Sequence, residues 1–545
     1  MKHLGCPANQ AQIYPNSWDQ HKLDPGKDLV RMFCMPEGGG PGNPLNEPRW
    51  HEFVEYNRVD VEVLRAIEQK LRVFPVPESE WRLWALDQHI NDRGLPIDMP
   101  FVRAAATLGE SHKARVMGES RETTGLDNPN SREQLLKWIK DAGVDAPDLR
   151  ASTVEALLEK KDLPVPVRDA LEQRQQLSMS SLAKYGTLLE AVGDDRQLRG
   201  VLQFYGASTG RWSSRLFNLQ NCPRGNLKEH DLVPARDYVL RNDTQMIQML
   251  WGDVSGVLSS LVRSAIHAPK NQQLVVADYA SIESVMLAWA SGCQTVLNVF
   301  REGRDSYKDF ATKLFNVKYE EVTKEQRSIS KPACLCAGYG MGFKGLQNYA
   351  AGMGIHLSDA DARRHVNTYR AAYPEIPQFW ADAEQAAATA IQKRTTVTAG
   401  HFTYRYQAPY LFIDLPSGRA LAYYKAALDD IGVLSYEGRE SGKQARITTR
   451  GSVLVENLVQ AISRDVLAHG LTQASAAPGL EIVGHVHDEI IALASDSDTS
   501  ALDRLLACMT SPPWAPDAPI RAAGWSGPFY RKDPGIRVYL SHFGL

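Results

Sequence analysis

The stretch that decides the fold is residues 273–292, QLVVADYASIESVMLAWASG. Residues 274–277 (LVVA) are a continuous run of apolar, strand-forming residues, which is the pattern of a buried strand. Asp278 follows at the end of this strand, and residues 281–289 have the composition of a helix. A carboxylate at the end of a buried strand is held rigidly, as a metal ligand must be. Asp is also a favoured helix cap, so this stretch alone leaves a purely structural role open.

A second stretch, residues 481–493 (EIVGHVHDEIIAL), has the pattern of two strands joined by a tight turn. Asp488 and Glu489 stand at the apex of this predicted hairpin. Acidic pairs at hairpin tips are usually solvated turn residues. Here apolar residues flank the pair on both sides, so we expect the two carboxylates to project from a core.

A third stretch, residues 327–342 (RSISKPACLCAGYGMG), carries Arg327, Lys331 and Tyr339 at spacings of four and eight. On a helix these spacings predict one slanted stripe of side chains. Two cations and an aromatic ring on one stripe suit a nucleoside triphosphate, because the cations pair with phosphates and the ring packs near the sugar and base. The pattern in isolation is more often that of an ordinary amphipathic helix.

Length and composition describe an ordinary globular protein. The 545 residues are enough for several domains, and 43% hydrophobic with 23% charged residues is typical of soluble chains. The formal net charge of −3 gives no global basic field, so a nucleic-acid partner would require basic residues confined to one cleft. No long apolar run or N-terminal signal pattern is present, which predicts a reducing cytoplasm and no membrane partner.

In this order, the three stretches resemble motifs A, B and C of the DNA polymerase I family (family A). A fourth segment, residues 208–221 (STGRWSSRLFNLQN), is similar to the TGRxSS…NLQN segment of that family. The resemblance implies an α/β (α+β) chain with the right-hand polymerase fold. That fold has an antiparallel palm sheet, helical fingers and a helical thumb.

The order of the motifs also implies domain boundaries. Residues 1–75 would be a remnant of the 3′→5′ exonuclease domain, and 76–200 the thumb with connecting helices. The palm would comprise 201–292, with motif A, and 421–545, with motif C and the C-terminal tail; the fingers would be 293–420, with motif B. Thumb helices are expected at 81–92, 99–119, 131–142 and 167–191, an irregular segment at 224–253, and strands between 395 and 450.

Tyr56 and Asp60 lie four residues apart on a helix predicted at 48–71 and resemble the third motif of the family's exonuclease. That nuclease also needs an upstream Asp-x-Glu pair, and none precedes Asp60. A two-metal hydrolytic site needs carboxylates converging from several elements. We therefore expect a remnant without proofreading activity. The missing half would reflect a truncation, a split gene or a partner that supplies the nuclease.

The resemblance assigns roles residue by residue. Those implied in catalysis are Asp278, Asp488, Glu489 and Lys331. Two Mg²⁺ ions would be the cofactors, held by Asp278, Asp488 and Tyr279. The dNTP would be bound by Arg327, Lys331, Tyr339, Glu283, Tyr307 and Leu335. Primer-template DNA would be bound by Arg211, Ser213, Ser214, Asn218, Gln220, Asn221, Gln460 and His487.

Three residues depart from what the family pattern or a regular helix would show. Tyr307 falls where many relatives carry a His that contacts the triphosphate. Leu335 falls where the family usually has Phe or Tyr packing against the sugar, which bears on fidelity and analogue selection. Pro332 lies within the motif B helix, so that helix either begins late or bends.

The function implied is template-directed addition of dNTPs to a primer 3′-hydroxyl by two-metal phosphoryl transfer, in phage DNA replication. Further partners would be a separate exonuclease subunit or replisome proteins, in the cytoplasm of the host cell. Two other classes stay open. A single-subunit RNA polymerase shares several of these elements, but Glu283 would clash with a ribose 2′-hydroxyl. A non-catalytic DNA-binding scaffold would not need Asp278 and Asp488 together with both cations.

Overall fold

The computed structural model describes residues 26–34, 48–74, 76–223, 225–440 and 442–531. These residues form two compact units. The described part of 1–82 joins with 379–455 in one unit, and 83–378 joins with the described part of 456–545 in the other. All of the polymerase-like motifs lie in the second unit.

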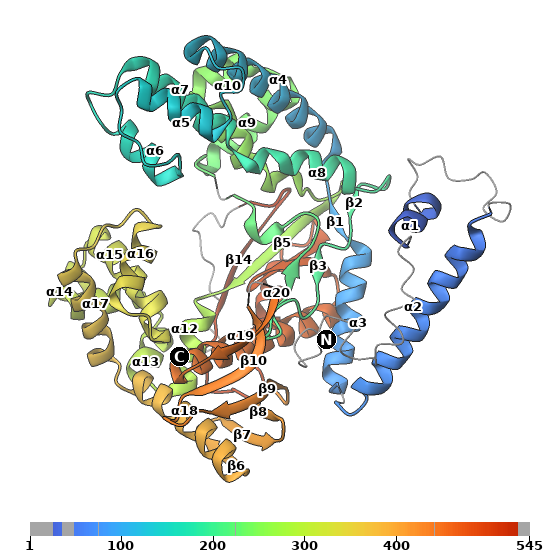
Figure 1. Cartoon of the computed structure of the whole chain (residues 1–545), viewed down its shortest axis with the longest axis vertical. Helices are drawn as coiled ribbons and strands as arrows, with labels where there is room; N and C mark the ends of the chain where they lie inside the picture. The colour runs from blue at the N-terminus through green and yellow to red at the C-terminus, as the bar shows by residue number, and fades with distance from the viewer. Residues whose placement is uncertain (1–25, 35–47, 75, 224, 441, 532–545) are drawn as a thin grey trace. The chain divides into compact units, whose positions relative to one another are not determined.

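A four-stranded antiparallel sheet carries the first two stretches, in the order β12-β13-β5-β14. Its strands are β5 (Gln272–Tyr279), β12 (Glu481–Val486), β13 (Glu489–Ser495) and β14 (Ala522–Gly527). The apolar run at 274–277 is buried on both faces of β5, which explains why it does not alternate with polar residues. Figure 1 shows β5 and β14 running side by side. The strand and the hairpin are confirmed, and β5 continues past Asp278 to Tyr279.

Helices cover this sheet. They include α12 (Ile282–Ser291), α19 (Gly451–Ala476) and α20 (Ala501–Cys508). The predicted helix after motif A is confirmed in α12, most of whose side chains are buried. The hydroxyl of Tyr279 donates to the carbonyl oxygen of Val466 at 3.2 Å, which ties β5 to α19. The end of β5, which carries Asp278, is therefore held by β13 and β14 on its two edges and by α19 on one face.

The region expected to form the thumb is helical. Its helices are α3 (Glu78–Arg93), α4 (Met99–Thr124), α5 (Arg132–Asp141), α6 (Ala151–Leu158), α7 (Val165–Leu177) and α8 (Ala183–Ala191). The first three predicted helices are confirmed, and α6 was not predicted. The single helix predicted at 167–191 is wrong, because α7 ends at Leu177 and α8 begins at Ala183. Serines dominate the break, and serine side chains compete with the helical backbone for hydrogen bonds.

The irregular segment predicted at 224–253 is also wrong. It contains α9 (Glu229–Leu240) and α10 (Thr244–Trp251), and α11 (Val254–Leu261) follows. Asp243 and Asp253 cap α10 and α11 by accepting hydrogen bonds from main-chain N–H groups three residues on. Val239 of α9 and Ile247 of α10 are fully buried and anchor the two helices on the core.

The motif B region is a further set of helices. They are α13 (Gln294–Arg301), α14 (Ser306–Phe315), α15 (Lys324–Cys336), α16 (Phe343–Ala351), α17 (Asp359–Ala372) and α18 (Glu375–Lys393). The capping box predicted at Thr323 is confirmed and starts α15, so Pro332 lies inside the helix and does not delay it. Tyr339 is not on α15: it ends a 3-10 helix, Ala337–Tyr339, and the predicted single stripe with Arg327 and Lys331 is therefore wrong.

Besides most of α18 and the first residues of α3 and α19, the described part of the first unit contains two whole helices and a second sheet. The helices are α1 (Gly26–Cys34), which was not predicted, and α2 (Trp50–Leu71), which confirms the helix expected at 48–71. The sheet has six antiparallel strands in the order β11-β10-β9-β8-β7-β6 and confirms the strands expected between 395 and 450. They are β6 (Thr396–Ala399), β7 (Phe402–Gln407), β8 (Tyr410–Asp414), β9 (Ala420–Leu428), β10 (Leu434–Glu440) and β11 (Lys443–Thr448).

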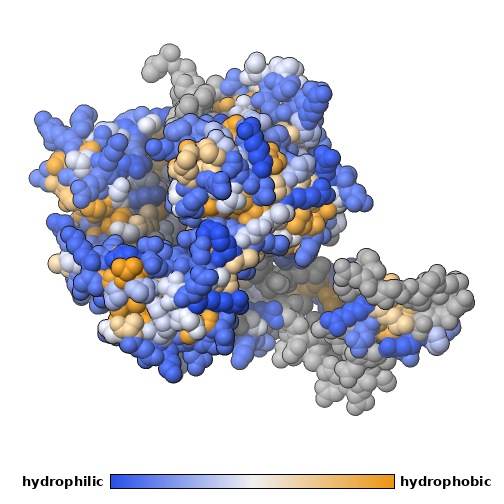
Figure 2. Space-filling view, turned by 90° about the horizontal axis from the view of Figure 1, so that it is seen from above, coloured by the Kyte–Doolittle hydropathy of each residue, from blue (hydrophilic) through white to orange (hydrophobic). Residues whose placement is uncertain are grey.

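Two short ladders complete the second unit: β1 (Leu95–Pro96) with β2 (Gln197–Leu198), and β3 (Leu202–Gln203) with β4 (Ser213–Ser214). On the face shown in Figure 2, hydrophilic residues predominate and apolar residues gather in small separate patches. Within the described part of the chain, no helix has the length and apolar composition that crossing a membrane requires.

Candidate active site

The two carboxylates predicted to hold metal lie side by side. Asp278 on β5 stands opposite Glu489, the first residue of β13, and the N–H of Tyr279 donates to the carbonyl oxygen of Asp488 at 3.2 Å. His487 adopts φ of 55°, the left-handed conformation that tight hairpin turns favour. The pairing of β5 with β13 thus brings together Asp278 and Asp488, which are 210 positions apart in the chain.

The side chains of Asp278 and Asp488 share a hydrogen bond, and burial raises the pKa of Asp488. Two carboxylates in contact cannot both be charged at low cost unless a cation lies between them. Oxygen donors of this kind are what Mg²⁺ prefers. The pair therefore fits a divalent metal ion.

Tyr279 can contribute to such a site only through its main-chain carbonyl. Its side chain is buried and its hydroxyl donates to Val466, away from the carboxylates. Among the described residues, no group of three or more His, Cys, Asp and Glu side chains is placed to hold a metal. A metal at the Asp278–Asp488 pair would thus complete its coordination with waters or substrate oxygens, which is usual for Mg²⁺.

A second feature is the ion pair between Arg211 and Glu283. Arg211 follows Gly210, whose φ of 90° turns the loop before β4, and Glu283 lies in the first turn of α12. Burial lowers the pKa of Arg211, while the nearby charges of Asp488 and Glu456, and Tyr339, act in the opposite direction. Arg211 therefore connects the carboxylate pair to the residues expected to bind the dNTP.

The cations of motif B surround Tyr307. The guanidinium of Arg327 lies 5.2 Å from the centre of the Tyr307 ring, and the ammonium of Lys331 lies 5.8 Å from it. Arg327 also donates to Asp305 at 2.7 Å. The Tyr307 side chain hydrogen-bonds Ser281, three residues after Asp278. This contact brings the cation cluster and the carboxylate pair into one site.

Two residues of this site were missed by the sequence reasoning. Asp305 caps α14 by accepting from the N–H groups of Tyr307 and Lys308, and it also binds Arg327. Its place before Ser306 carried a capping signal, but nothing in the sequence indicated the ion pair. Glu456 lies beside Arg211, and burial raises its pKa. Leu335 is half-buried on α15, one turn after Lys331.

Several residues predicted to bind DNA also build their own loop. Asn218 accepts from the N–H of Asn221 at 3.1 Å, and Gln220 donates to the carbonyl of Trp212 at 3.3 Å. Ser213 contacts Gln203, and the buried hydroxyl of Ser214 has no hydrogen-bond partner among the described residues. Gln460 accepts from Thr209 and donates to Glu456, while His487 is exposed. The loop and α19 thus present one polar surface beside Arg211.

The exonuclease-like residues lie on α2. Tyr56 hydrogen-bonds Asp60 along α2, in the first unit. No cluster of metal-binding side chains accompanies them among the described residues. That residues 1–75 are a remnant without proofreading activity stays a prediction.

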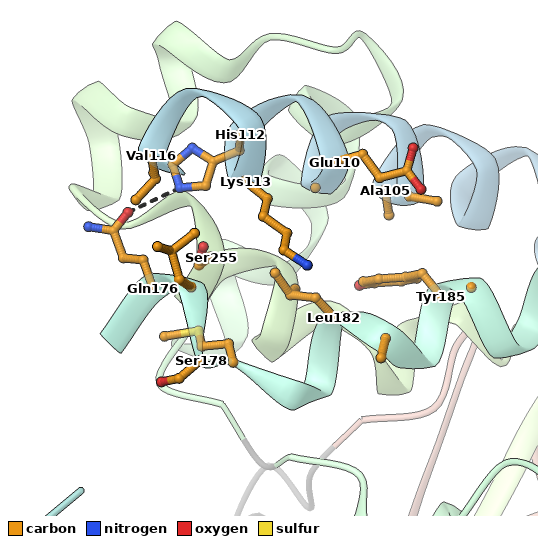
Figure 3. A pocket seen from close by; sticks show the side chains of 16 residues that line it. Ala105, Glu110, His112, Lys113, Val116, Gln176, Ser178, Leu182, Tyr185 and Ser255 are labelled. Atoms are coloured by element: carbon orange, nitrogen blue, oxygen red, sulfur yellow. Dashed lines mark hydrogen bonds between the residues drawn. The ribbon is translucent and has the colours of Figure 1, made fainter. Parts of the chain in front are cut away.

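A separate cavity of about 320 Å³ lies between α4 and the α7–α8 segment (Figure 3). His112 and Gln176 close one side through a 3.1 Å hydrogen bond, and Lys113, Leu182 and Tyr185 line another part. None of the residues assigned to catalysis, dNTP or DNA lines it. It is a packing gap within the helical region and adds nothing to the site.

Comparison with known proteins agrees with these features. The family model described as DNA polymerase family A matches residues 105–408. The DNA polymerase of Bacillus phage SP02 is 38% identical over 97% of this chain and 84% of the relative. The thermostable DNA polymerases I of Thermus filiformis and Thermus aquaticus are 26% and 25% identical. These matches cover 65% and 55% of this chain, but only 40% and 33% of the relatives.

Among solved structures, the POL domain of Pol1 from M. smegmatis, in a complex with DNA primer-template and dNTP, matches with a TM-score of 0.58. The match covers 88% of this chain and 74% of that chain at 18% identity, which shows the fold. The expected right-hand fold, with an antiparallel palm sheet and helical fingers and thumb, is confirmed. The family match and the phage relative together establish that this chain belongs to DNA polymerase family A.

Proposed function

We propose that the protein extends the 3′-hydroxyl of a DNA primer with dNTPs, as a template directs. The observation that carries this proposal is the convergence of two clusters. The Asp278–Asp488 pair offers oxygen ligands, and the cluster of Arg327, Lys331 and Tyr307 offers cations. The contact between Tyr307 and Ser281 joins them. A triphosphate needs both kinds of partner at once.

Two Mg²⁺ ions would be held by Asp278, Asp488 and the main-chain carbonyl of Tyr279. When bound, they would lower the pKa of the primer hydroxyl and neutralise phosphate charge. Arg327 and Lys331 would bind the triphosphate, with Lys331 placed to donate a proton to the departing pyrophosphate. Binding of the triphosphate would compete with Asp305 for Arg327. Arg211, the 208–221 loop, Gln460 and His487 would contact the primer-template.

The biological role we propose is phage DNA replication in the cytoplasm of a host cell. The similarity to the SP02 enzyme over nearly the whole chain supports it. Replisome proteins or a separate exonuclease subunit would be the remaining partners.

The test is primer extension with a 5′-labelled primer, a template, Mg²⁺ and dNTPs, comparing the wild type with Asp488→Asn. Loss of one carboxylate of the pair should lower the extension rate roughly a thousandfold, because several kcal/mol of charge stabilisation are lost. Asp503→Asn, an exposed position on α20, is the matched control and should extend normally. DNA binding by gel shift should be unchanged in both variants. Extension by Asp488→Asn at the wild-type rate would refute the site.

A primer with a mismatched 3′ end, incubated without dNTPs, tests the proofreading expectation in the same assay. A primer that keeps its length indicates a polymerase without its own exonuclease. Shortening that persists in Asp488→Asn but disappears in Asp60→Asn would show that Tyr56 and Asp60 belong to a working nuclease.

A further inference from the structure

The carboxylate of Glu489 is bound by a residue from the far end of the described chain. The hydroxyl of Tyr530 donates to Oε1 of Glu489 at 2.5 Å. Glu489 stands directly opposite Asp278 in the sheet and follows Asp488 in the chain. Nothing in the sequence of the tail, which is rich in aromatic residues, Pro and Gly, assigned it any part in the site.

Tyr530 is itself held on several sides. After β14 the chain pairs with residues 266–268: the N–H of Tyr530 donates to the carbonyl of Ile266 at 2.9 Å, and Phe529 bridges to His267. The Tyr530 side chain is only 1% exposed. A buried ring with a fixed backbone can present its hydroxyl in one direction only.

Arg263 fixes the hydroxyl further. Its guanidinium donates to the Tyr530 oxygen at 3.3 Å and to the carbonyls of Pro223 and Cys222, both at 3.1 Å. Cys222 directly follows the 208–221 loop expected to bind the primer-template. A continuous series of hydrogen bonds thus connects the end of that loop, through Arg263 and Tyr530, to Glu489.

We propose that Tyr530 is a positioning residue for the polymerase reaction. By holding one oxygen of Glu489, it keeps this third carboxylate from turning onto the Asp278–Asp488 pair. Burial and the charge of Glu489 raise the pKa of Tyr530, which favours the protonated phenol as the donor of this bond. Without the bond, Glu489 would turn toward the pair and would take a coordination position that the metal needs for water or substrate oxygens. The inference rests on the proposed function.

The test is Tyr530→Phe, which removes the hydroxyl and keeps the ring. We expect kcat for primer extension to fall roughly tenfold, because a hydrogen bond to a charged group is lost, while KM for dNTP stays within about twofold. Tyr185→Phe is the matched control: its hydroxyl is equally buried and donates to the carbonyl of Leu258 at 2.7 Å, in the thumb helices. This control should keep the wild-type kcat, even if its thermal midpoint falls as far as that of Tyr530→Phe.

A double-mutant cycle with Glu489→Gln separates positioning from mere stability. If Tyr530 acts through Glu489, the double variant should lose no more than the single variants do. Losses that multiply to roughly a hundredfold would overturn the inference, and so would a wild-type kcat in Tyr530→Phe. Failure of the wild type to extend any primer would instead overturn the proposed function.

Discussion

Glu283 and Arg211 illustrate how single residues gain their roles from pairing. They come from segments 72 residues apart and form an ion pair beside Asp488. The sequence assigned Arg211 to DNA and Glu283 to the dNTP, each by resemblance. The pairing means that Glu283 is oriented by Arg211 before any substrate arrives. A side chain held in this way can exclude a substituent on the sugar by steric contact.

At this scale we predict that Glu283→Ala admits ribonucleotides. Removing the carboxylate opens space for a 2′-hydroxyl, so the preference for dNTP over rNTP should fall at least about tenfold. The measurement is competitive incorporation of dNTP and rNTP on one template. Glu320→Ala, at an exposed position near α15, should keep the wild-type preference. An unchanged ratio in Glu283→Ala would mean that another residue excludes the ribose, and a wild-type preference for rNTP would favour the RNA polymerase alternative.

Among the elements, α15 shows how a helix can be specified locally and still end unexpectedly. Thr323 and Gln326 form reciprocal capping bonds of 3.1 and 3.0 Å, and Arg327 lies one turn further on. The helix tolerates Pro332 but ends at Cys336, which places Tyr339 on a separate turn. Arg327 and Lys331 thus lie on α15, whereas Tyr339 lies on the turn that follows. The cap at Thr323 therefore stabilises the helix that carries the two cations and not the turn that carries Tyr339.

We therefore predict that Thr323→Ala weakens dNTP binding. Loss of an N-cap costs about 1 kcal/mol, so KM for dNTP should rise by up to about fivefold with little change in kcat. Main-chain amides in the first turn of α15 should also exchange hydrogen faster.

The control is Ser358→Ala, which removes the equivalent cap of α17, where Ser358 accepts from Asp361 at 3.1 Å. Faster exchange there with an unchanged KM would assign the effect to α15. A rise in KM in both variants would indicate that the helices of this region are destabilised in general.

On the scale of the whole molecule, buried contacts of Trp212 with Asp87 and His485 link three segments that are far apart in the sequence. Trp212 donates to Asp87 on α3 at 2.9 Å, and its ring packs edge-on against His485 on β12, 4.6 Å away. Burial raises the pKa of Asp87 from 3.8 to about 6 and lowers that of His485 from 6.5 to about 3. Asp87 and His485 are each only 2% exposed.

The two shifts have opposite effects on stability. Between pH 6.5 and 3, the unfolded chain binds a proton at His485 that the folded chain does not, so acidification destabilises the fold. Between pH 6 and 3.8, the folded chain binds a proton at Asp87 that the unfolded chain does not, so acidification stabilises it. Within the shared window the two contributions offset each other.

We predict that Asp87→Asn removes the proton uptake of Asp87 and with it the stabilisation at low pH. The destabilisation that His485 causes on acidification is then no longer offset. Relative to wild type, its free energy of unfolding should fall by about 2 kcal/mol more between pH 7 and pH 4. Denaturant unfolding at a series of pH values measures this difference, and only the change with pH is compared. Asp503→Asn should follow the wild-type curve. Parallel curves for Asp87→Asn and wild type would contradict the assignment.

The sequence by itself determined β5, the β12–β13 hairpin and the capped start of α15. In each case the signal is local, because an apolar run, a turn or a cap acts within a few residues of itself. It also predicted roles for Asp278, Asp488, Arg327 and Lys331, whose motifs are short and ordered. It missed α9 and α10, because both helices are short and bury few side chains, so their pattern shows no long apolar stripe.

Only the tertiary structure decided which groups meet. The contacts of Asp305 with Arg327, of Arg211 with Glu283 and of Tyr530 with Glu489 join segments between 22 and 72 residues apart. No local pattern encodes such contacts, because the approach of two segments depends on how the sheet and its covering helices pack. The motifs that predict a catalytic site are therefore local in the sequence, while the groups that contact those residues are brought to them by packing.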